Sequence, residues 1–453
     1  MSRLLAPLRR GCTRAYSSRA ADANFSVFRG ILSLLPTSLF SDPIIFSTNS
    51  YWRSRLEGDR VLINTKTPTL TKPLKKEERT KLPRGHLAHD DIIGKGPRYP
   101  IKSNKGALYR ITHPTFEDYI VRTPRFVTPI YPADANLIVS LLDLHVTPPV
   151  PGEEPNEPLE ILEAGTGHGS LTLHLARAVN GANTSPPARP PYSQRQILEL
   201  PETKKKAVAV EEEQKEEDHE TKAKNEELQR NWDAWRAQRN AIVHTVDISP
   251  HYSQHAENIV RGFRRGIYVG NVDFYVSSVE KWIQEQMARR STSQGSPDPF
   301  LSHVILDMPS AHLRIPHVAQ FMKDDAVLAI FMPSITQLGD CVEFISKERL
   351  PLFQEKIVEV GTGISSGRLW ELRMTMKRSP KDALSREATA EENLDGTAEY
   401  SSDTVGEEVP SLTKGAKADR DEVLVCRPQV GARIAGGGFV GIWRKKKSWV
   451  DLS

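Results

Sequence analysis

Cysteine is scarce in this chain of 453 residues, which has only Cys12, Cys341 and Cys426. None of them has a second cysteine or a histidine at metal-ligand spacing, so the sequence suggests neither a disulfide framework nor a zinc site. Long apolar runs are also missing, since residues 31–46 are interrupted by two prolines and one aspartate. That stretch is too short to span a bilayer, and we expect no membrane insertion.

A strong excess of one charge is absent too, because the formal net charge is only +4. This value alone does not demand a nucleic-acid partner, so charge has to be examined locally. Charged residues make up 26% of the chain, which also contains 32 prolines. Both values indicate one sizeable globular unit with solvated insertions, rather than a chain that is packed throughout.

The N-terminal segment does have a local excess of positive charge. Five arginines lie within the first nineteen residues, and no acidic residue occurs before Asp22. This composition is typical of a mitochondrial transit peptide, and residues 14–18 look like a matrix-protease cleavage site. We therefore assign residues 1–20 to a transit peptide and expect a location in the mitochondrial matrix; a disordered basic tail is the alternative. Residues 21–84 follow as a linker that we expect to be partly disordered.

The remaining chain predicts two folded units. In residues 85–130, short apolar runs alternate with Gly, Pro and Asn, which predicts a small N-terminal β domain. A helix over residues 134–145 leads into a main domain formed by residues 131–378 and 421–448. Strand-like runs alternate there with helical segments, which predicts an α/β fold with a doubly wound sheet. The predicted strands are residues 159–164, 242–248, 272–276, 303–308 and 326–332.

A first polar insertion, residues 181–240, interrupts this domain. It combines a Pro/Ser/Arg stretch with an acidic, lysine-rich block, and such a composition cannot bury a core. Near its end, residues 226–239 are predicted to form an exposed helix that carries Trp232 and Trp235.

A second insertion, residues 379–420, is rich in Ser, Thr and Glu. It separates two strand candidates, residues 369–376 and 422–426. Residues 439–443 then form a late strand candidate. A late strand that returns through a long connection suits an antiparallel hairpin at one edge of the sheet.

A glycine-rich loop follows the first predicted strand of the main domain and opens a helix that ends near Val179. Its residues are Glu163, Ala164, Gly165, Thr166, Gly167, His168, Gly169, Ser170 and Leu171. Glycines let the backbone turn sharply and approach a ligand, while free N–H groups at a helix start favour negatively charged groups. In this strand-to-helix context the loop predicts a site for a nucleotide-type cofactor.

The spacing of the loop distinguishes between cofactors. A dinucleotide-binding loop needs glycine or alanine at its sixth position, where this loop has Ser170, which disfavours a dehydrogenase. The G-x-G-x-G pattern after an acidic residue instead resembles motif I of class I methyltransferases. In that motif the acidic residue, here Glu163, helps to hold the amino-acid end of S-adenosylmethionine.

Asp247 ends the second predicted strand, where a carboxylate can accept hydrogen bonds from two ribose hydroxyls. It lies 84 residues beyond Glu163, and 24 residues once the 60-residue insertion is set aside. That separation is close to the roughly 20 residues expected between a glycine loop and its ribose carboxylate. An N-cap for the following helix is the alternative role.

Five stretches together resemble the tRNA (adenine-N1)-methyltransferase family, which modifies adenine 58 in the T loop. They are residues 89–95, 114–119, 130–134, 163–175 and 306–309. The resemblance implies a small N-terminal β domain before a Rossmann-like catalytic domain, with S-adenosylmethionine as cofactor and tRNA as partner. It also implies a homo-tetramer, or a hetero-oligomer with a non-catalytic subunit.

The resemblance assigns roles to further residues. Asp307 would lie beside the cofactor, orient the exocyclic amine of adenine and stabilise the positive charge that develops on the base; the alternative is a turn-forming aspartate before Pro309. Tyr131 would line the pocket and stack on an extruded base, or else serve as a buried packing residue. Ser278 stands where the family tends to have an aspartate that binds the adenine amine of the cofactor. Residues 310–312 also depart from the family pattern.

The predicted function is methylation of adenine N1 at position 58 of mitochondrial tRNA. The alternatives are a methyltransferase of another mitochondrial RNA and a non-catalytic RNA-binding subunit on the same fold. A subunit that does not bind the cofactor would not need three loop glycines, Glu163 and Asp247 together, so we favour the enzyme. His251 and His255 lie one helical turn apart without a third ligand, and we expect them to be surface residues.

Overall fold

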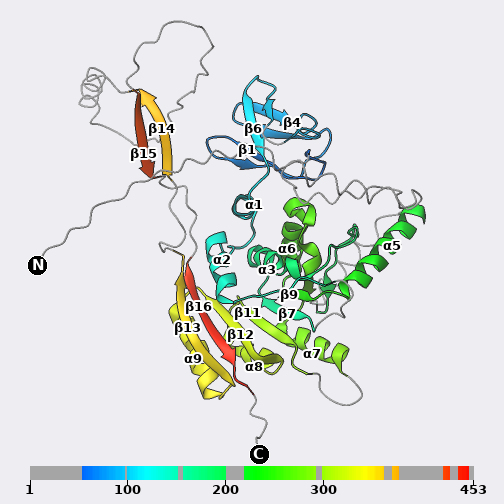
Figure 1. Cartoon of the computed structure of the whole chain (residues 1–453), viewed down its shortest axis with the longest axis vertical. Helices are drawn as coiled ribbons and strands as arrows, with labels where there is room; N and C mark the ends of the chain where they lie inside the picture. Colours follow the sequence, from blue (N-terminus) through cyan, green and yellow to red (C-terminus); the bar gives the residue numbers. More distant parts are fainter. Residues whose placement is uncertain are drawn as a thin grey trace, which may run out of the picture. The chain divides into compact units, whose positions relative to one another are not determined.

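The computed structural model of the chain describes residues 54–96, 99–150, 157–199, 219–291, 298–361, 370–376, 422–428 and 437–447 (Figure 1). The transit peptide expected at residues 1–20 and the insertion at 379–420 lie outside the described residues. Among the described helices, none combines the length and the apolar character that a membrane crossing requires.

The largest sheet within the described residues has eight strands, in the order β13-β16-β12-β11-β7-β9-β10-β8. They are β7 (Leu159–Ala164), β8 (Gln196–Ile197), β9 (Ala241–Asp247), β10 (Val272–Val276), β11 (Leu301–Leu306), β12 (Met322–Met332), β13 (Leu352–Val360) and β16 (Gly438–Lys445). Only β16 runs against the others, between β12 and β13. The order β10-β9-β7-β11-β12 is the 3-2-1-4-5 order of a doubly wound fold, which confirms the predicted fold class.

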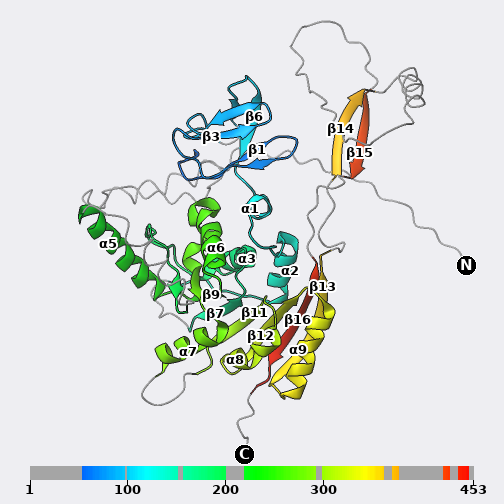
Figure 2. The same ribbon diagram turned by 180° about the vertical axis from the view of Figure 1, so that it is seen from behind.

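The central strands are apolar on both faces because helices cover both sides of the sheet (Figures 1 and 2). Helices α2 (Pro132–Leu141), α3 (Ser170–Ala178) and α6 (Pro250–Gly262) lie on one face, and α7 (Val279–Arg290), α8 (Ile315–Ala319) and α9 (Ile335–Lys347) lie on the other. Within β7, Ile161 belongs to the first of these cores and Leu162 to the second. Alternate side chains of one strand therefore serve two apolar layers.

All five strands that we predicted for this domain are present; β7 and β10 have the predicted ends, and the ends of β9, β11 and β12 are shifted by one to four residues. We missed β13, whose central residues are mostly exposed, and the two-residue β8. Short 3-10 turns connect several elements, at Asn180–Ala182, Phe263–Gly266, Val269–Asn271 and Ala311–Leu313.

The N-terminal β domain begins earlier than we predicted. A four-stranded sheet has the order β2-β1-β6-β5, and β3 and β4 form a separate pair. The strands are β1 (Leu62–Asn64), β2 (Thr69–Leu70), β3 (Arg79–Leu82), β4 (Gly85–Ala88), β5 (Pro100–Lys102) and β6 (Leu108–Thr112). The linker expected up to residue 84 is wrong for residues 54–84, because Val61, Ile63 and Leu74 are fully buried in the core of this domain. Within the range 85–130, Phe116–Arg122 is a helix, α1.

The insertion at 181–240 is more ordered than its composition predicted. Its last part is helix α5 (His219–Arg236), which begins before the expected residue 226, and Trp232 is only 3% exposed rather than on the surface. Polar contacts hold its first part, since the Arg261 guanidinium on α6 donates to the carbonyl oxygens of Pro190, Pro191 and Tyr192. Backbone carbonyls, which composition does not reveal, therefore anchor this polar segment.

The late strands are arranged differently from our prediction. β14 (Trp370–Met376) and β15 (Glu422–Pro428) pair with each other as a separate two-stranded sheet. It is β16 that joins the main sheet, and it lies inside that sheet rather than at its edge.

A buried ion pair fixes the start of β10. Arg239 donates to both carboxylate oxygens of Asp273 at 2.8 Å, and Arg236 lies 2.9 Å from the same carboxylate. Burial alone would raise the pKa of Asp273, but the two guanidinium groups hold it well below its usual range. The pair is therefore ionised, and each partner depends on the other.

We expect Arg239→Ala to lower the free energy of unfolding by about 3 kcal/mol, because it leaves a buried carboxylate with one remaining partner. Urea denaturation measures this change. Arg289→Ala, which breaks the more exposed pair with Glu285, is the matched control and should cost less than about 1 kcal/mol. Equal losses of unfolding free energy in the two variants would show that the buried ion pair stabilises the protein no more than the exposed pair does.

Candidate active site

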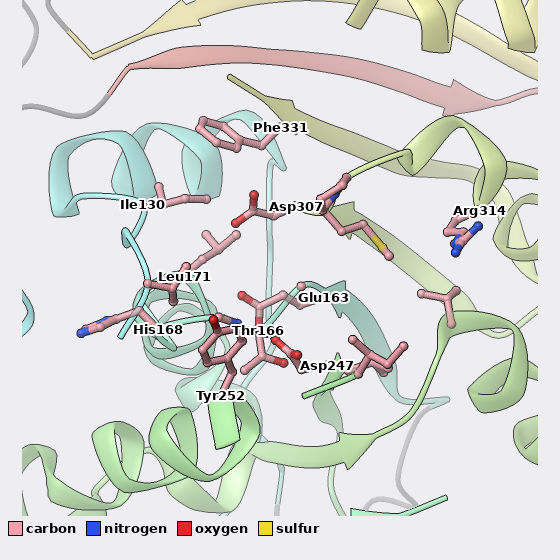
Figure 3. Close-up of a pocket in the computed structure, with 18 of the residues that line it drawn as sticks. Ile130, Glu163, Thr166, His168, Leu171, Asp247, Tyr252, Asp307, Arg314 and Phe331 are labelled. Atoms are coloured by element: carbon pink, nitrogen blue, oxygen red, sulfur yellow. Dashed lines mark hydrogen bonds between the residues drawn. The ribbon is translucent and has the colours of Figure 1, made fainter. Parts of the chain in front are cut away.

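A cavity of about 510 Å³ opens at the carboxyl ends of β7, β9, β10, β11 and β12 (Figure 3). This edge is where ligands bind in doubly wound sheets, beside the point at which the strand order reverses. Its volume lies within the usual range for small-molecule sites. The residues that line it come from the loop before α2, from the glycine loop and from the segments that follow the other strands.

The glycine loop is required by packing within the protein. Gly165, Gly167 and Gly169 all have positive φ angles, of 97°, 50° and 82°. A Cβ on Gly165 would lie 1.9 Å from the backbone oxygen of Asp307, and one on Gly169 would lie 2.9 Å from Cα of Ala256. We expected the glycines to admit a ligand, but at these two positions the colliding atoms belong to the chain itself.

Glu163 lies at the end of β7 and is only 1% exposed. Its Oε2 accepts hydrogen bonds from the hydroxyls of Thr172 at 2.6 Å and Thr245 at 2.7 Å. Burial raises the pKa of Glu163 to about 8, and the nearby charges of Asp307 and Asp247 act in the same direction. The two hydroxyls oppose this shift without cancelling it.

Asp247 and Asp307 face the same cavity from the ends of β9 and β11 (Figure 3). Asp247 accepts hydrogen bonds from the backbone N–H of Gly167 at 2.9 Å and of Ser249 at 2.8 Å. Burial raises the pKa of Asp247, and burial followed by the charge of Asp247 raises the pKa of Asp307 to about 7. Three carboxylates thus converge in one cavity, an arrangement that favours a positively charged ligand.

The other predicted site residues fall into two groups. Those that line the cavity are Gly165, Thr166, Gly167, His168, Ser170, Leu171 and Ser278. The lining does not include Gly169 or Tyr131. The ring of His168 points away from the three carboxylates, toward His255, whose ring centroid lies 5.3 Å away (Figure 3).

Tyr131 is 8% exposed and stands directly before α2. Its hydroxyl accepts a hydrogen bond from Arg125 at 2.8 Å. This placement corresponds to the packing alternative that we left open for Tyr131. Of the two histidines expected on the surface, His251 is exposed, whereas His255 is half-buried and packs edge-to-face against Phe126.

Residues that the sequence did not single out also line the cavity. Phe331 and Met332 are the last residues of β12 and Pro333 follows them, Tyr252 lies in the first turn of α6, and Gln337 belongs to α9. The position of β12 was predicted from the sequence. Because ligands bind at the carboxyl ends of the strands in such sheets, the argument that places Asp307 in the site also predicts Phe331–Pro333 there.

No protein-family model matches the chain. The tRNA (adenine(58)-N(1))-methyltransferase TrmI of Thermus thermophilus is 26% identical to it over 291 residues, which cover 64% of this chain and 78% of that protein. The chain is related to the TrmI methyltransferases. A second relative, the tRNA (adenine(57)-N(1)/adenine(58)-N(1))-methyltransferase TrmI of Methanocaldococcus jannaschii, is 33% identical over 79 residues, covering 17% of this chain and 24% of that protein.

Solved structures give a weaker comparison. A SAM-dependent O-methyltransferase of Thermotoga maritima aligns at 15% identity and a TM-score of 0.48, covering 88% of this chain and 97% of that one. TrmI of Aquifex aeolicus aligns at 16% identity and a TM-score of 0.46, covering 87% and 100%.

The three carboxyl groups predict that the folding stability of the ligand-free protein depends on pH. Carboxyl groups ionise near pH 4 in an unfolded chain, whereas the folded cavity holds its protons until about pH 7 to 8. The stability that these groups contribute is therefore fully present below about pH 4 and is lost progressively as the pH rises from about 4 to about 7 or 8. Thermal melting should show a falling Tm over that range.

Glu163→Gln should flatten this fall, since glutamine still accepts from Thr172 and Thr245 but carries no charge. Glu285→Gln, at a distance on α7, should melt with the wild-type pH profile. A Glu163→Gln profile as steep as that of the wild type would rule out Glu163 as the origin of the pH dependence.

Proposed function

We propose that this chain transfers the methyl group of S-adenosylmethionine to N1 of adenine in tRNA, at position 58. The observation that carries the proposal is the set of three carboxylates around one cavity, two of them buried and Asp307 half-buried, in a chain related to TrmI. A protein keeps such a cluster of like charges only where a ligand compensates it, because each buried carboxylate is costly without a partner.

The cavity residues fit this cofactor. Asp247 ends β9 beside the glycine loop, where a carboxylate can accept from ribose hydroxyls. Within the described residues, hydrogen bonds reach only Oε2 of Glu163, so Oε1 is available to an ammonium group. The exposed side chain of Ile248 and the buried side chain of Val279 offer apolar surface beside Asp247 for a purine ring.

When bound, S-adenosylmethionine supplies an electrophilic methyl group on a sulfonium centre. The adenine N1 lone pair forms the new N–C bond while the C–S electron pair returns to sulfur, so positive charge moves onto the base. Asp307 accepts a hydrogen bond from the exocyclic amine and stabilises that charge. The cavity contributes positioning and the exclusion of water, which account for much of the acceleration in a reaction of this kind.

The non-catalytic subunit is the weaker candidate. Burial raises the pKa of all three carboxyl groups, and the charge of Asp247 adds to the shifts of Glu163 and Asp307, which destabilises the ligand-free fold at neutral pH. A subunit that only binds RNA gains nothing from that arrangement.

We also propose that the substrate is mitochondrial tRNA and that the protein acts in the matrix as an oligomer. The arginine-rich, acid-free composition of residues 1–19 supports import. The oligomeric state follows only from the family resemblance.

We expect Asp307→Asn to lower kcat by about 10² to 10³-fold, because the variant lacks the charge that stabilises the methylated base. Single-turnover transfer of a labelled methyl group to unmodified tRNA measures the effect. The affinity for S-adenosylhomocysteine, which has no sulfonium charge, should change little. Asp340→Asn, on the exposed side of α9, is the control. Wild-type turnover in Asp307→Asn would overturn the assignment.

An experiment in cells tests whether the substrate is mitochondrial or cytosolic tRNA. We expect deletion of the gene to remove 1-methyladenosine at position 58 from mitochondrial tRNA and to leave cytosolic tRNA unchanged, as measured by mass spectrometry of nucleosides from the two fractions. Restoration by the full chain, but not by a chain without residues 1–20, would support import through this segment. Loss of the modification from cytosolic tRNA alone would refute the mitochondrial assignment.

A further inference from the structure

The cavity lacks a carboxylate on the loop that follows β10. Ser278 occupies the position where the family resemblance places an aspartate for the adenine amine, and it lines the cavity. Its hydroxyl caps α7 by accepting from the backbone N–H of Lys281 at 3.4 Å. A serine in this role provides no negative charge for an amine.

The insertion brings a carboxylate to the same place. β8 pairs in parallel with β10, with Gln196 opposite Tyr275 and Ile197 opposite Val276. Parallel strands end at the same edge of a sheet, so the residues after β8 arrive at the edge where the cavity opens. The backbone N–H groups of Leu198 and Glu199 then both donate to the carbonyl oxygen of Val276, at 3.1 and 3.2 Å.

The Glu199 side chain is directed at Ser278. Its Oε2 accepts from the Ser278 hydroxyl at 2.8 Å and from the Ser278 backbone N–H at 3.3 Å. Of the residues that the structure describes, none donates a hydrogen bond to Oε1 or forms an ion pair with this carboxylate. Ser278 thereby fixes one oxygen of an exposed carboxylate and leaves the other for a ligand.

We propose that Glu199 recognises the exocyclic amine of the cofactor's adenine, in place of the carboxylate that Ser278 lacks. This inference rests on the proposed function. A carboxylate accepts hydrogen bonds only, so it favours a 6-amino purine and repels the oxygen of a 6-oxo purine. The insertion between β7 and β9 is then part of the cofactor site, and Glu199 determines its specificity for the base.

One other carboxylate could serve the same end of the cavity. Glu280 lines the cavity directly, whereas Glu199 lies at its margin through its contact with Ser278, but Oε1 of Glu280 lies 3.1 Å from Nε of Arg314. A guanidinium that already neutralises this group makes it a poor acceptor for a further amine. The geometry therefore favours Glu199, and Glu280 is the rival to be tested beside it.

The test is a set of calorimetric titrations of the full chain with S-adenosylhomocysteine and with S-inosylhomocysteine, which carries a 6-oxo group instead of the 6-amino group. We expect the wild type to prefer the adenosyl compound by about tenfold or more. Glu199→Ala should bind the adenosyl compound about tenfold more weakly and the inosyl compound unchanged or better. Glu199→Gln should bind the inosyl compound better than the wild type does, because its amide can donate to the 6-oxo group.

The controls separate the possible causes. Glu285→Ala, on the distal part of α7, should keep the wild-type preference, and the Tm of each variant reports folding. Equal weakening of both ligands in Glu199→Ala would mean that Glu199 only holds Ser278 in place, which would overturn the inference. Loss of the preference in Glu280→Gln with its retention in Glu199→Ala would assign the amine to Glu280 instead. A wild type that binds neither compound would refute the proposed cofactor itself.

Discussion

The burial of carboxyl groups around one cavity is the central physical constraint in this structure, and repulsion between them adds to its cost. Glu163, Asp247 and Asp307 end three strands of one parallel sheet, and the sheet order brings the strand ends together. Two threonine hydroxyls and two backbone N–H groups solvate these carboxylates in part, but the pKa of Glu163 is still raised to about 8. A cationic ligand bound in this cavity would favour the ionised form of these carboxyl groups and so offset the cost of their burial.

The glycine loop and the carboxylates form one structural unit. Gly165 packs against the backbone oxygen of Asp307, and the N–H of Asp307 donates to the oxygen of Ala164 at 2.9 Å. Gly167 in turn donates to Asp247. A movement of the loop would therefore displace Asp247 and Asp307 as well, so the backbone couples the positions of the two carboxylates.

Much of the fold could be predicted from the sequence, because the buried strands of a parallel sheet are short apolar runs between helical segments. Because the carboxyl ends of parallel strands lie at one edge of a sheet, the sequence alone also predicted that Glu163, Asp247 and Asp307 lie close together. The search for short apolar runs failed for β13, where seven of nine residues are exposed or half-buried, and for β8, which consists of two residues. It also failed for the first part of the insertion at 181–240, which is held by an arginine on α6 that donates to backbone carbonyls. Glu199 could not be predicted either, because it reaches Ser278 only through the pairing of β8 with β10, and β8 is too short to be recognised in the sequence.

The position of β16 has a consequence for the order in which the chain folds. β13 pairs only with β16 in the main sheet, and the outer edge of β12 is likewise covered by β16. Because Gly438–Lys445 follows β12 only after a long connection that includes β13, β14 and β15, the ribosome must synthesise all of that connection before this side of the sheet can close. Until then β12 presents an unpaired edge, the kind of surface on which chaperones act and through which partly made chains aggregate.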